Sequence, residues 1–152
     1  MTLLKKTQEI AVIAHDIRSL HNVGSLFRSC DAFGVERLYL TGITGTPPRH
    51  EIAKVALGSE CRVAWEYRAS VLGLMEELRR EGMTIVALET GVGSSLIEAY
   101  VPTARTALII GNEVEGIPQD VLRACDVRVE ISMRGTNGRS TFLLLQGLRC
   151  LL

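Results

Sequence analysis

Short apolar runs alternate along the chain with segments in which apolar and charged residues recur at helical spacing. The runs are rich in Val, Ile and Leu, which is typical of strands buried on both faces of a parallel sheet. This alternation predicts an α/β fold, with a mostly parallel sheet flanked by helices. We expect strands at residues 9–14, 36–42, 61–67, 83–89, 106–111 and 127–133.

The segments between these strands carry helix signals. Residues 69–82 place apolar side chains near i, i+3, i+4 and i+7 spacing against Glu and Arg, which predicts an amphipathic helix. Gly34 and Gly82 suit the position just after a helix, and Pro118 suits a first turn. Helices are therefore expected at about 22–33, 50–57 and 69–82, and from Pro118 onward. No linker or repeat interrupts the pattern, so residues 1–152 are expected to form one domain.

The composition excludes few classes of function. Lys and Arg total 17 and Asp and Glu total 17, which argues against indiscriminate binding of polyanions but is compatible with a local basic patch. No apolar run approaches the roughly 18 residues that span a bilayer, and the first residues show no signal-peptide core. We therefore expect a cytoplasmic protein without membrane contact.

Residue types that bind metals are scattered along the chain. The cysteines form no C-x-x-C pair, and the three histidines are too dispersed in sequence to suggest a metal site. We expect no metal and interpret the cysteines as buried thiols. They are Cys30, Cys61, Cys125 and Cys150.

Polar residues follow three of the predicted strands, where open α/β sheets bind their ligands. The first group, N-x-G-x-x-x-R, consists of Asn22, Gly24 and Arg28. The amides that open this helix could hold an anion. The alternative is that Asn22 is only a helix N-cap and Arg28 a solvated charge.

The second and third groups are also built around glycine. In G-x-E-x-x-G, Gly111 and Gly116 permit tight turns, so the carboxylate of Glu113 must project from the loop between them. The alternative is a surface turn with a solvated Glu. The third group, I-x-M-x-G, comprises Ile131, Met133 and Gly135. The G-x-G-x-x-G fingerprint of dinucleotide-binding folds is absent after the first strand.

These three groups, in this order, resemble the motifs of the SpoU class of RNA ribose 2′-O-methyltransferases, the TrmH-like branch of the SPOUT enzymes. The resemblance runs from about residue 9 to residue 135. It implies a deep trefoil knot at the C-terminal end of the sheet, an exception to the rule that chains do not thread. It also implies S-adenosylmethionine as cofactor, a homodimer, and methyl transfer to a ribose 2′-hydroxyl of tRNA or rRNA.

The resemblance assigns roles to particular residues. Arg28 is placed nearest the hydroxyl, where a guanidinium acts first as a phosphate clamp and electrostatic activator. Asn22 and Glu113 orient Arg28 and its loop, and Ser140 lies at the reacting end. The residues assigned to cofactor binding follow three strands: Leu88, Glu89 and Thr90; Gly111, Asn112 and Gly116; and Ile131 and Met133.

The tail after Gly135 departs from the family pattern. The family continues with S-L-N-V-S-V-A-A, whereas this chain has Ser140, Thr141 and Phe142 at the corresponding place, so that Phe142 stands where Asn is expected. Codons can be chosen for residues 138–150 that encode the family pattern S-L-N-V-S-V-A-A when they are read one base out of register. A frameshift, in the gene or in its sequencing, is one explanation and an evolved tail is the other. The DNA around codons 134–140 decides between them.

The tail leaves a second class of function open. A knotted protein that binds RNA or cofactor but is catalytically weak or inactive is the alternative to an enzyme, because a phenyl group cannot make the hydrogen bonds of an amide. As written, the leucines after Phe142 can still form a helix with a broad apolar face. A third interpretation is a generic α/β nucleotide-binding domain with unrelated chemistry.

Overall fold

The computed structural model describes residues 8–91, 93–132 and 140–152, and the side chains of residues 140–143 are not described. Within these residues a seven-stranded sheet has the order β3-β2-β1-β6-β4-β7-β5, and every strand pair is parallel. The strands are β1 (Glu9–His15), β2 (Arg37–Thr41), β3 (Trp65–Arg68), β4 (Thr84–Leu88), β5 (Ser95–Leu96), β6 (Arg105–Ile110) and β7 (Val127–Glu130). The predicted α/β fold with a parallel sheet is confirmed.

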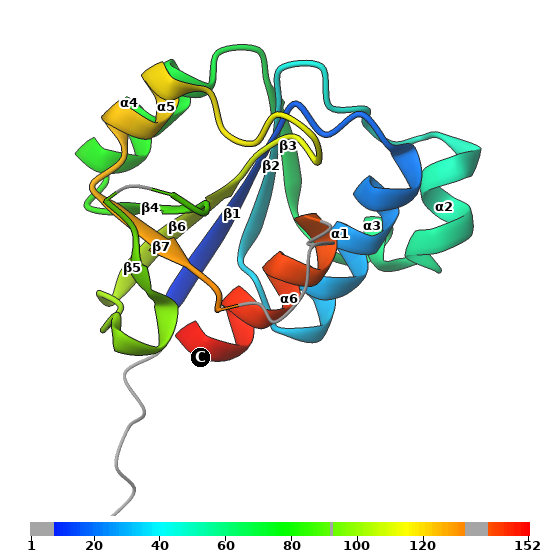
Figure 1. Cartoon of the computed structure of the whole chain (residues 1–152). Coiled ribbons are helices and arrows are strands. Elements are labelled where there is room, and N and C mark those ends of the chain that lie inside the picture. Colours follow the sequence, from blue (N-terminus) through cyan, green and yellow to red (C-terminus); the bar gives the residue numbers. More distant parts are fainter. Residues whose placement is uncertain (1–7, 92, 133–139) are drawn as a thin grey trace, which may run out of the picture.

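Helices cover both faces of this sheet (Figure 1). They are α1 (Leu20–Ala32), α2 (His50–Ala56), α3 (Ser59–Arg62), α4 (Val71–Arg80), α5 (Gln119–Ala124) and α6 (Ser140–Leu151), with a 3₁₀ turn η1 (Ile97–Ala99). Helices α1, α2, α3 and α6 lie on one face and α4 and α5 on the other. Two apolar cores result, one on each face, because alternate residues of the central strands point to opposite sides.

Helix α1 begins earlier than its sequence pattern predicts. Ser19 is the N-cap, and its hydroxyl accepts a hydrogen bond from the backbone N–H of Asn22. The alternative interpretation of Asn22 as the N-cap is therefore wrong, and its amide is free for another partner. The helix ends as expected, with Gly34 at a φ of +65°, a conformation that glycine adopts without strain.

Two predicted strands differ from those observed. The segment expected as a strand at 61–67 begins with the short helix α3, which follows Leu57 and Gly58, both at positive φ, and β3 starts only at Trp65. The last strand ends at Glu130 rather than at residue 133. The alternation of apolar residues does not show where backbone hydrogen bonds between strands begin or end. The start of β3 and the end of β7 therefore could not be predicted from it.

The cysteines are less uniform than expected. Cys30 is buried, and burial raises the pKa of its thiol, but Cys125 is half-buried and Cys61 and Cys150 are exposed. The interpretation of all of them as buried thiols is wrong for the last two. Cys61 lies in the unexpected helix α3 and Cys150 near the end of α6, where both stay in contact with water.

The tail as written forms a helix that packs on the sheet. Leu144, Leu148 and Leu151 of α6 are buried in the same core as α1. A Cβ on Gly147 would lie 3.2 Å from Leu88 Cδ2, so the helix approaches the sheet closely. The predicted helix with an apolar face is confirmed. The predicted knot depends on residues 133–139, which lie outside the described residues.

Neither a membrane-spanning helix nor a metal-binding cluster is found among the described residues. None of their helices is both long and apolar enough to cross a membrane. Nor do three or more His, Cys, Asp or Glu side chains gather among them in a group that could hold a metal ion.

Candidate functional site

The first two predicted groups and Ile131 of the third begin at one edge of the sheet. Strands β6, β4 and β7 are neighbours, and β1 lies on the other side of β6. Because all four are parallel, the segments that follow them lie at the same carboxyl edge. These segments are residues 16–19 before α1, the loop 111–117 after β6, residues 89–91 after β4, and residues 131–132 after β7.

Loop 111–117 is a closed turn. The backbones of Asn112 and Gly116 exchange two hydrogen bonds, of 3.2 and 3.0 Å. The side-chain oxygen of Asn112 accepts from the N–H groups of Val114 (2.8 Å) and Glu115 (3.0 Å). A Cβ on Gly111 would come within 2.5 Å of the backbone of Gly116. The first glycine is therefore required by close approach within the turn, as the sequence predicts.

A direct hydrogen bond joins the first and second groups. The side-chain amide of Asn22 donates to Oε1 of Glu113 over 2.8 Å, although the two residues are 91 positions apart. Asn22 lies in the first turn of α1 and Glu113 in loop 111–117. The interpretation of Glu113 as a merely solvated surface carboxylate is therefore wrong, because it fixes the loop against the helix.

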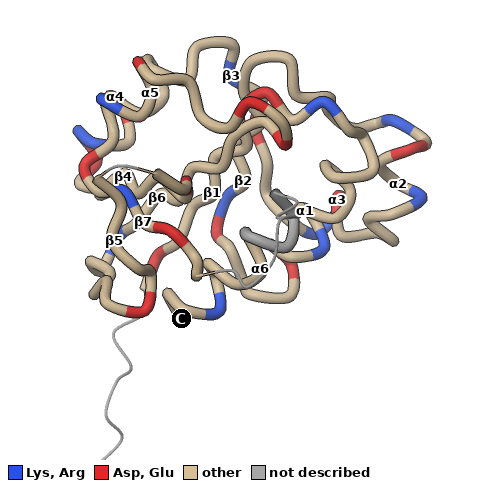
Figure 2. The backbone as a smooth tube through the Cα atoms, in the orientation of Figure 1, with Lys and Arg blue, Asp and Glu red and all other residues tan. Residues whose placement is uncertain are grey.

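Arg28 lies on the exposed side of the same helix. Among the described residues it has no hydrogen bond or ion pair, whereas Arg62, Arg68 and Arg105 are each held by a carboxylate. Charges of both signs are interspersed along the backbone, and α2 carries both (Figure 2). A guanidinium without an internal partner can take an external anion such as a phosphate.

Gly24 has a packing role that the sequence did not reveal. A Cβ at this position would lie 2.7 Å from the carbonyl oxygen of Ile52 and 2.9 Å from Cβ of Val55. Both atoms belong to α2, so glycine lets α1 and α2 approach closely. The residue serves the site indirectly, because it sets where α1 lies.

Glu89 connects the segment after β4 to loop 111–117. Its Oε2 accepts from the backbone N–H of Ile117 over 2.8 Å, and its Oε1 accepts from the N–H of Thr90 over 3.0 Å. Leu88 is buried and Thr90 is exposed. Gly91 has open space around it, since a Cβ there would meet nothing within 4 Å. The residues expected to bind cofactor after β4 and β6 are thus brought together.

Two residues at the end of β1 take part in this site and were not predicted. The carbonyl of Asp16 accepts from the side-chain amide of Asn112 over 2.9 Å, and Asp16 Oδ1 accepts from the N–H of Ile43. Asp16 has a φ of +54°, unusual for a residue other than glycine. Nothing in the local pattern signals it, because its partners lie 27 and 96 positions away.

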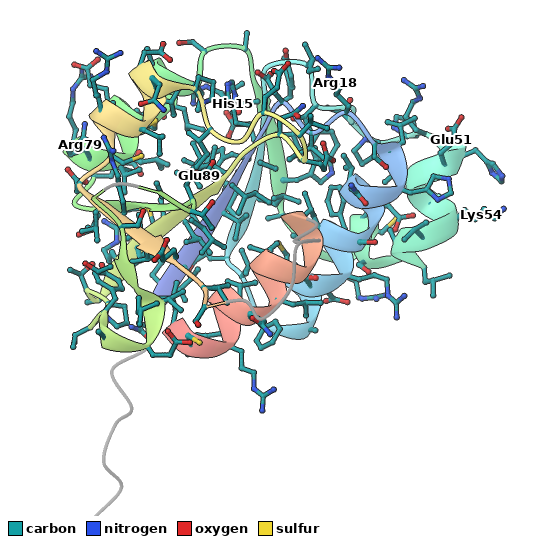
Figure 3. The ribbon with its side chains drawn as sticks, in the orientation of Figure 1. His15, Arg18, Glu51, Lys54, Arg79 and Glu89 are labelled. Carbon is teal, nitrogen blue, oxygen red and sulfur yellow. The ribbon has the colours of Figure 1, made fainter. Side chains whose placement is uncertain are left out.

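His15 supports Asp16 from inside the protein. Its Nε2 lies 3.2 Å from Asp16 Oδ2, and its Nδ1 lies 2.9 Å from Thr41 Oγ1. Burial lowers the pKa of His15, against the opposing effect of Asp16 and Asp120. In Figure 3, His15 and Glu89 lie toward the inside of the molecule, whereas Lys54 points outward from α2.

The third group is described only in part. Ile131 is buried and belongs to the core on the α1 face. Met133 and Gly135 lie outside the described residues, as does the side chain of Ser140, although its backbone begins α6. Their predicted roles therefore remain predictions.

Known proteins resemble this chain over most of its length. The model of the family described as SpoU rRNA Methylase matches residues 9–140. The tRNA (guanosine(18)-2'-O)-methyltransferase TARBP1 of Mus musculus is 29% identical over 136 residues, which is 86% of this chain and 8% of that protein. The tRNA (guanosine(18)-2'-O)-methyltransferase of Aquifex aeolicus is 27% identical, over 88% of this chain and 63% of that protein. This chain thus spans less than two thirds of either relative.

Solved structures share the fold. The SpoU methyltransferase AviRb from Streptomyces viridochromogenes, in complex with the cofactor AdoMet, superposes with a TM-score of 0.85 at 23% identity. The superposition covers 99% of this chain and 60% of AviRb. AviRb and this chain therefore share the arrangement of strands and helices described above.

Proposed function

This chain belongs to the SpoU rRNA Methylase family, and we propose that it transfers a methyl group from S-adenosylmethionine to a ribose 2′-hydroxyl of tRNA or rRNA. The observation that carries the proposal is the Asn22–Glu113 hydrogen bond, which joins the first two motifs. The same helix carries Arg28, which has no hydrogen bond or ion pair among the described residues. Relatives of this chain are named as tRNA and rRNA 2'-O-methyltransferases, which supports the class of substrate.

The residues present fit the cofactor. When bound, S-adenosylmethionine supplies an electrophilic methyl group on its sulfonium. The segments 89–91 and 111–117 are joined through Glu89 at the carboxyl edge of the sheet. A Cβ on the exposed Gly91 would meet nothing within 4 Å, so a ligand can approach the backbone there. Leu88, Glu89, Thr90, Gly111, Asn112 and Gly116 shape this part of the site, and the family resemblance assigns Ile131 and Met133 to the same cofactor.

The chain's own polar residues serve the RNA end of the reaction. The hydroxyl oxygen must lie in line with the methyl group, which requires the RNA backbone to be held still. Arg28 carries a fixed positive charge and binds a phosphate next to the acceptor ribose. Asn22 and Glu113 fix the start of the helix that carries Arg28 against the loop 111–117. Ser140 completes the reacting end.

We further propose that the chain between β7 and α6 threads through a loop to form the trefoil knot of this family. The close packing of α6 on the strands supports this, because Gly147 lies against Leu88 and Leu108. A homodimer is proposed on the same family grounds.

A methyl-transfer assay tests the activity. Labelled S-adenosylmethionine is incubated with unmodified total tRNA and rRNA. The R28A variant is expected to lose incorporation by at least about 100-fold, because one charged transition-state contact contributes roughly 3 kcal/mol. R80A is the matched control, since Arg80 is exposed on α4 and pairs with Glu76.

A second pair of variants tests the contact between motifs. E113Q weakens the bond from Asn22, for which a charged hydrogen bond contributes about 1.5–3 kcal/mol, so a loss of roughly 10-fold or more is expected. E115Q changes an exposed carboxylate of the same loop and should keep full activity. Cofactor binding without incorporation in the unaltered chain would instead favour the inactive binding protein.

A further inference from the structure

Loop 111–117 is held by residues from three other elements. Asn22 of α1 holds Glu113, Asp16 after β1 holds Asn112, and Glu89 after β4 holds Ile117. The contact from Asp16 uses a main-chain carbonyl. The contact from Glu89 uses its side-chain carboxylate, so a substitution at position 89 can remove this contact.

The geometry around Glu89 leaves its carboxylate fully engaged. One oxygen accepts from Ile117 N–H and the other from Thr90 N–H, so the group bridges two loops. The carboxylate fills the space in front of Gly116, because a Cβ there would lie within 2.3 Å of Glu89 Oε2. The two loops are therefore built around one ionised side chain.

The backbone of Glu89 is fixed as well. Its N–H donates to the carbonyl of Val129 in β7 over 3.0 Å, and its carbonyl accepts from the hydroxyl of Ser94. The residue thus contacts β7 and the segment after β4 through its main chain and loop 111–117 through its side chain. Few rotamers remain open to a side chain that is held at both ends.

We propose that Glu89 is a positioning residue that joins the loops 89–91 and 111–117 through its carboxylate, and that it is not itself a ligand of the cofactor. The consequence for cofactor binding depends on the function proposed above. A charged acceptor makes stronger hydrogen bonds than a neutral one, so the negative charge of Glu89 strengthens the connection between the two loops.

Two variants and a matched control separate this role from a ligand role. E89Q keeps the shape but replaces one acceptor by an NH₂ group that faces a backbone N–H, and E89A removes both acceptors. Glu130 is the control, because it accepts from Gly91 N–H over 3.3 Å in the same loop and makes no described hydrogen bond to loop 111–117. Thermal unfolding of each variant verifies that it is folded.

The first measurement is amide hydrogen exchange on the cofactor-free chain. Peptides covering residues 111–117 should exchange about tenfold faster in E89Q and faster still in E89A, but unchanged in E130Q. Unchanged exchange in both Glu89 variants overturns the proposal, whatever the chain binds.

The second measurement is calorimetric titration with S-adenosylmethionine. E89Q should raise Kd about tenfold and KM for RNA should not move, whereas E98Q, which changes an exposed carboxylate on η1, should leave Kd within about twofold. Lost affinity with unchanged exchange would make Glu89 a direct ligand and contradict us. If the unaltered chain binds no S-adenosylmethionine, the proposed function fails, and exchange alone decides whether Glu89 joins the loops.

Discussion

At the scale of single residues, the site is organised by polar side chains whose partners are far away in sequence. Asn22, Arg28, Glu113 and the glycines of the second motif could be picked out from the sequence because their spacing is distinctive. Asp16 and Glu89 could be assigned no bridging role in advance. Their hydrogen bonds span 96 and 28 positions, and no local pattern encodes such pairs.

His15 gives this edge of the sheet a dependence on pH. Burial lowers the pKa of His15 in the folded chain below its ordinary value of 6.5. Near this pH the unfolded chain therefore binds a proton at His15 more readily than the folded chain does. The contribution of neutral His15 to the free energy of unfolding is complete above pH 6.5, and it declines as the pH falls toward the pKa of the folded chain. Asp16 on one side and Asp120 on α5 moderate the effect, since both favour the charged ring.

The H15N variant tests this linkage. The free energy of unfolding from urea titrations should fall as the pH decreases below about 6.5 in the unaltered chain, and fall less steeply in H15N. H21N is the control, because His21 is exposed on α1. Parallel pH curves for the unaltered chain and H15N would contradict the assignment.

At the scale of elements, the strands that are buried on both faces could be predicted from the sequence. The limits of strands that depend on backbone pairing could not. Strands β1, β4 and β6 were expected nearly as found because they are buried on both faces and thus almost continuously apolar. Helix α3 was not, because four residues are too few to show a helical period. The end of β7 was placed too late because Ile131 continues the apolar pattern after its ladder has ended.

The tail is the element whose contribution most needs measurement. Leu148 of α6 is fully buried, whereas Leu145 of the same helix is 39% exposed. Truncating a buried leucine costs about 2–5 kcal/mol through lost burial and the cavity left behind. L148A should therefore lower the free energy of unfolding by about that amount, and L145A by less than about 1 kcal/mol. Urea unfolding gives both values, and equal small effects would mean that the tail is not part of the core.

This result also bears on the origin of the tail. A helix that stabilises the fold with Leu144, Leu148 and Leu151 in the core is compatible with the chain as written. It does not restore the amide that Phe142 replaces. Stability and activity are therefore separate consequences of the same segment, and a stable but weakly active chain would favour the alternative of a binding protein.

At the scale of the whole molecule, we propose that two copies of the chain share each site, with Arg28 supplied by one copy. Arg28 follows Asn22 by six residues, which is about 9 Å along a helix axis. Asn22 is bonded to loop 111–117 of the same chain, whereas Arg28 has no described hydrogen bond or ion pair within it. We propose that this guanidinium serves a methyl donor that is bound by the partner chain.

Mixing two variants tests this arrangement after light scattering has established a dimer. The S-adenosylmethionine concentration is set above the Kd of the unaltered chain and well below the raised Kd of E89A, so that each variant alone is nearly inactive. R28A lacks the guanidinium, and E89A lacks the contact between the cofactor loops. Random 1:1 re-association makes about half of the dimers mixed, and in each mixed dimer one site combines an intact Arg28 with intact loops, so about a quarter of full activity should return. If both parts of a site belong to one chain, every site in the mixture carries a defect and no activity returns. R28A mixed with itself is the control, and recovery that tracks the fraction of mixed dimers is the result that a shared site requires.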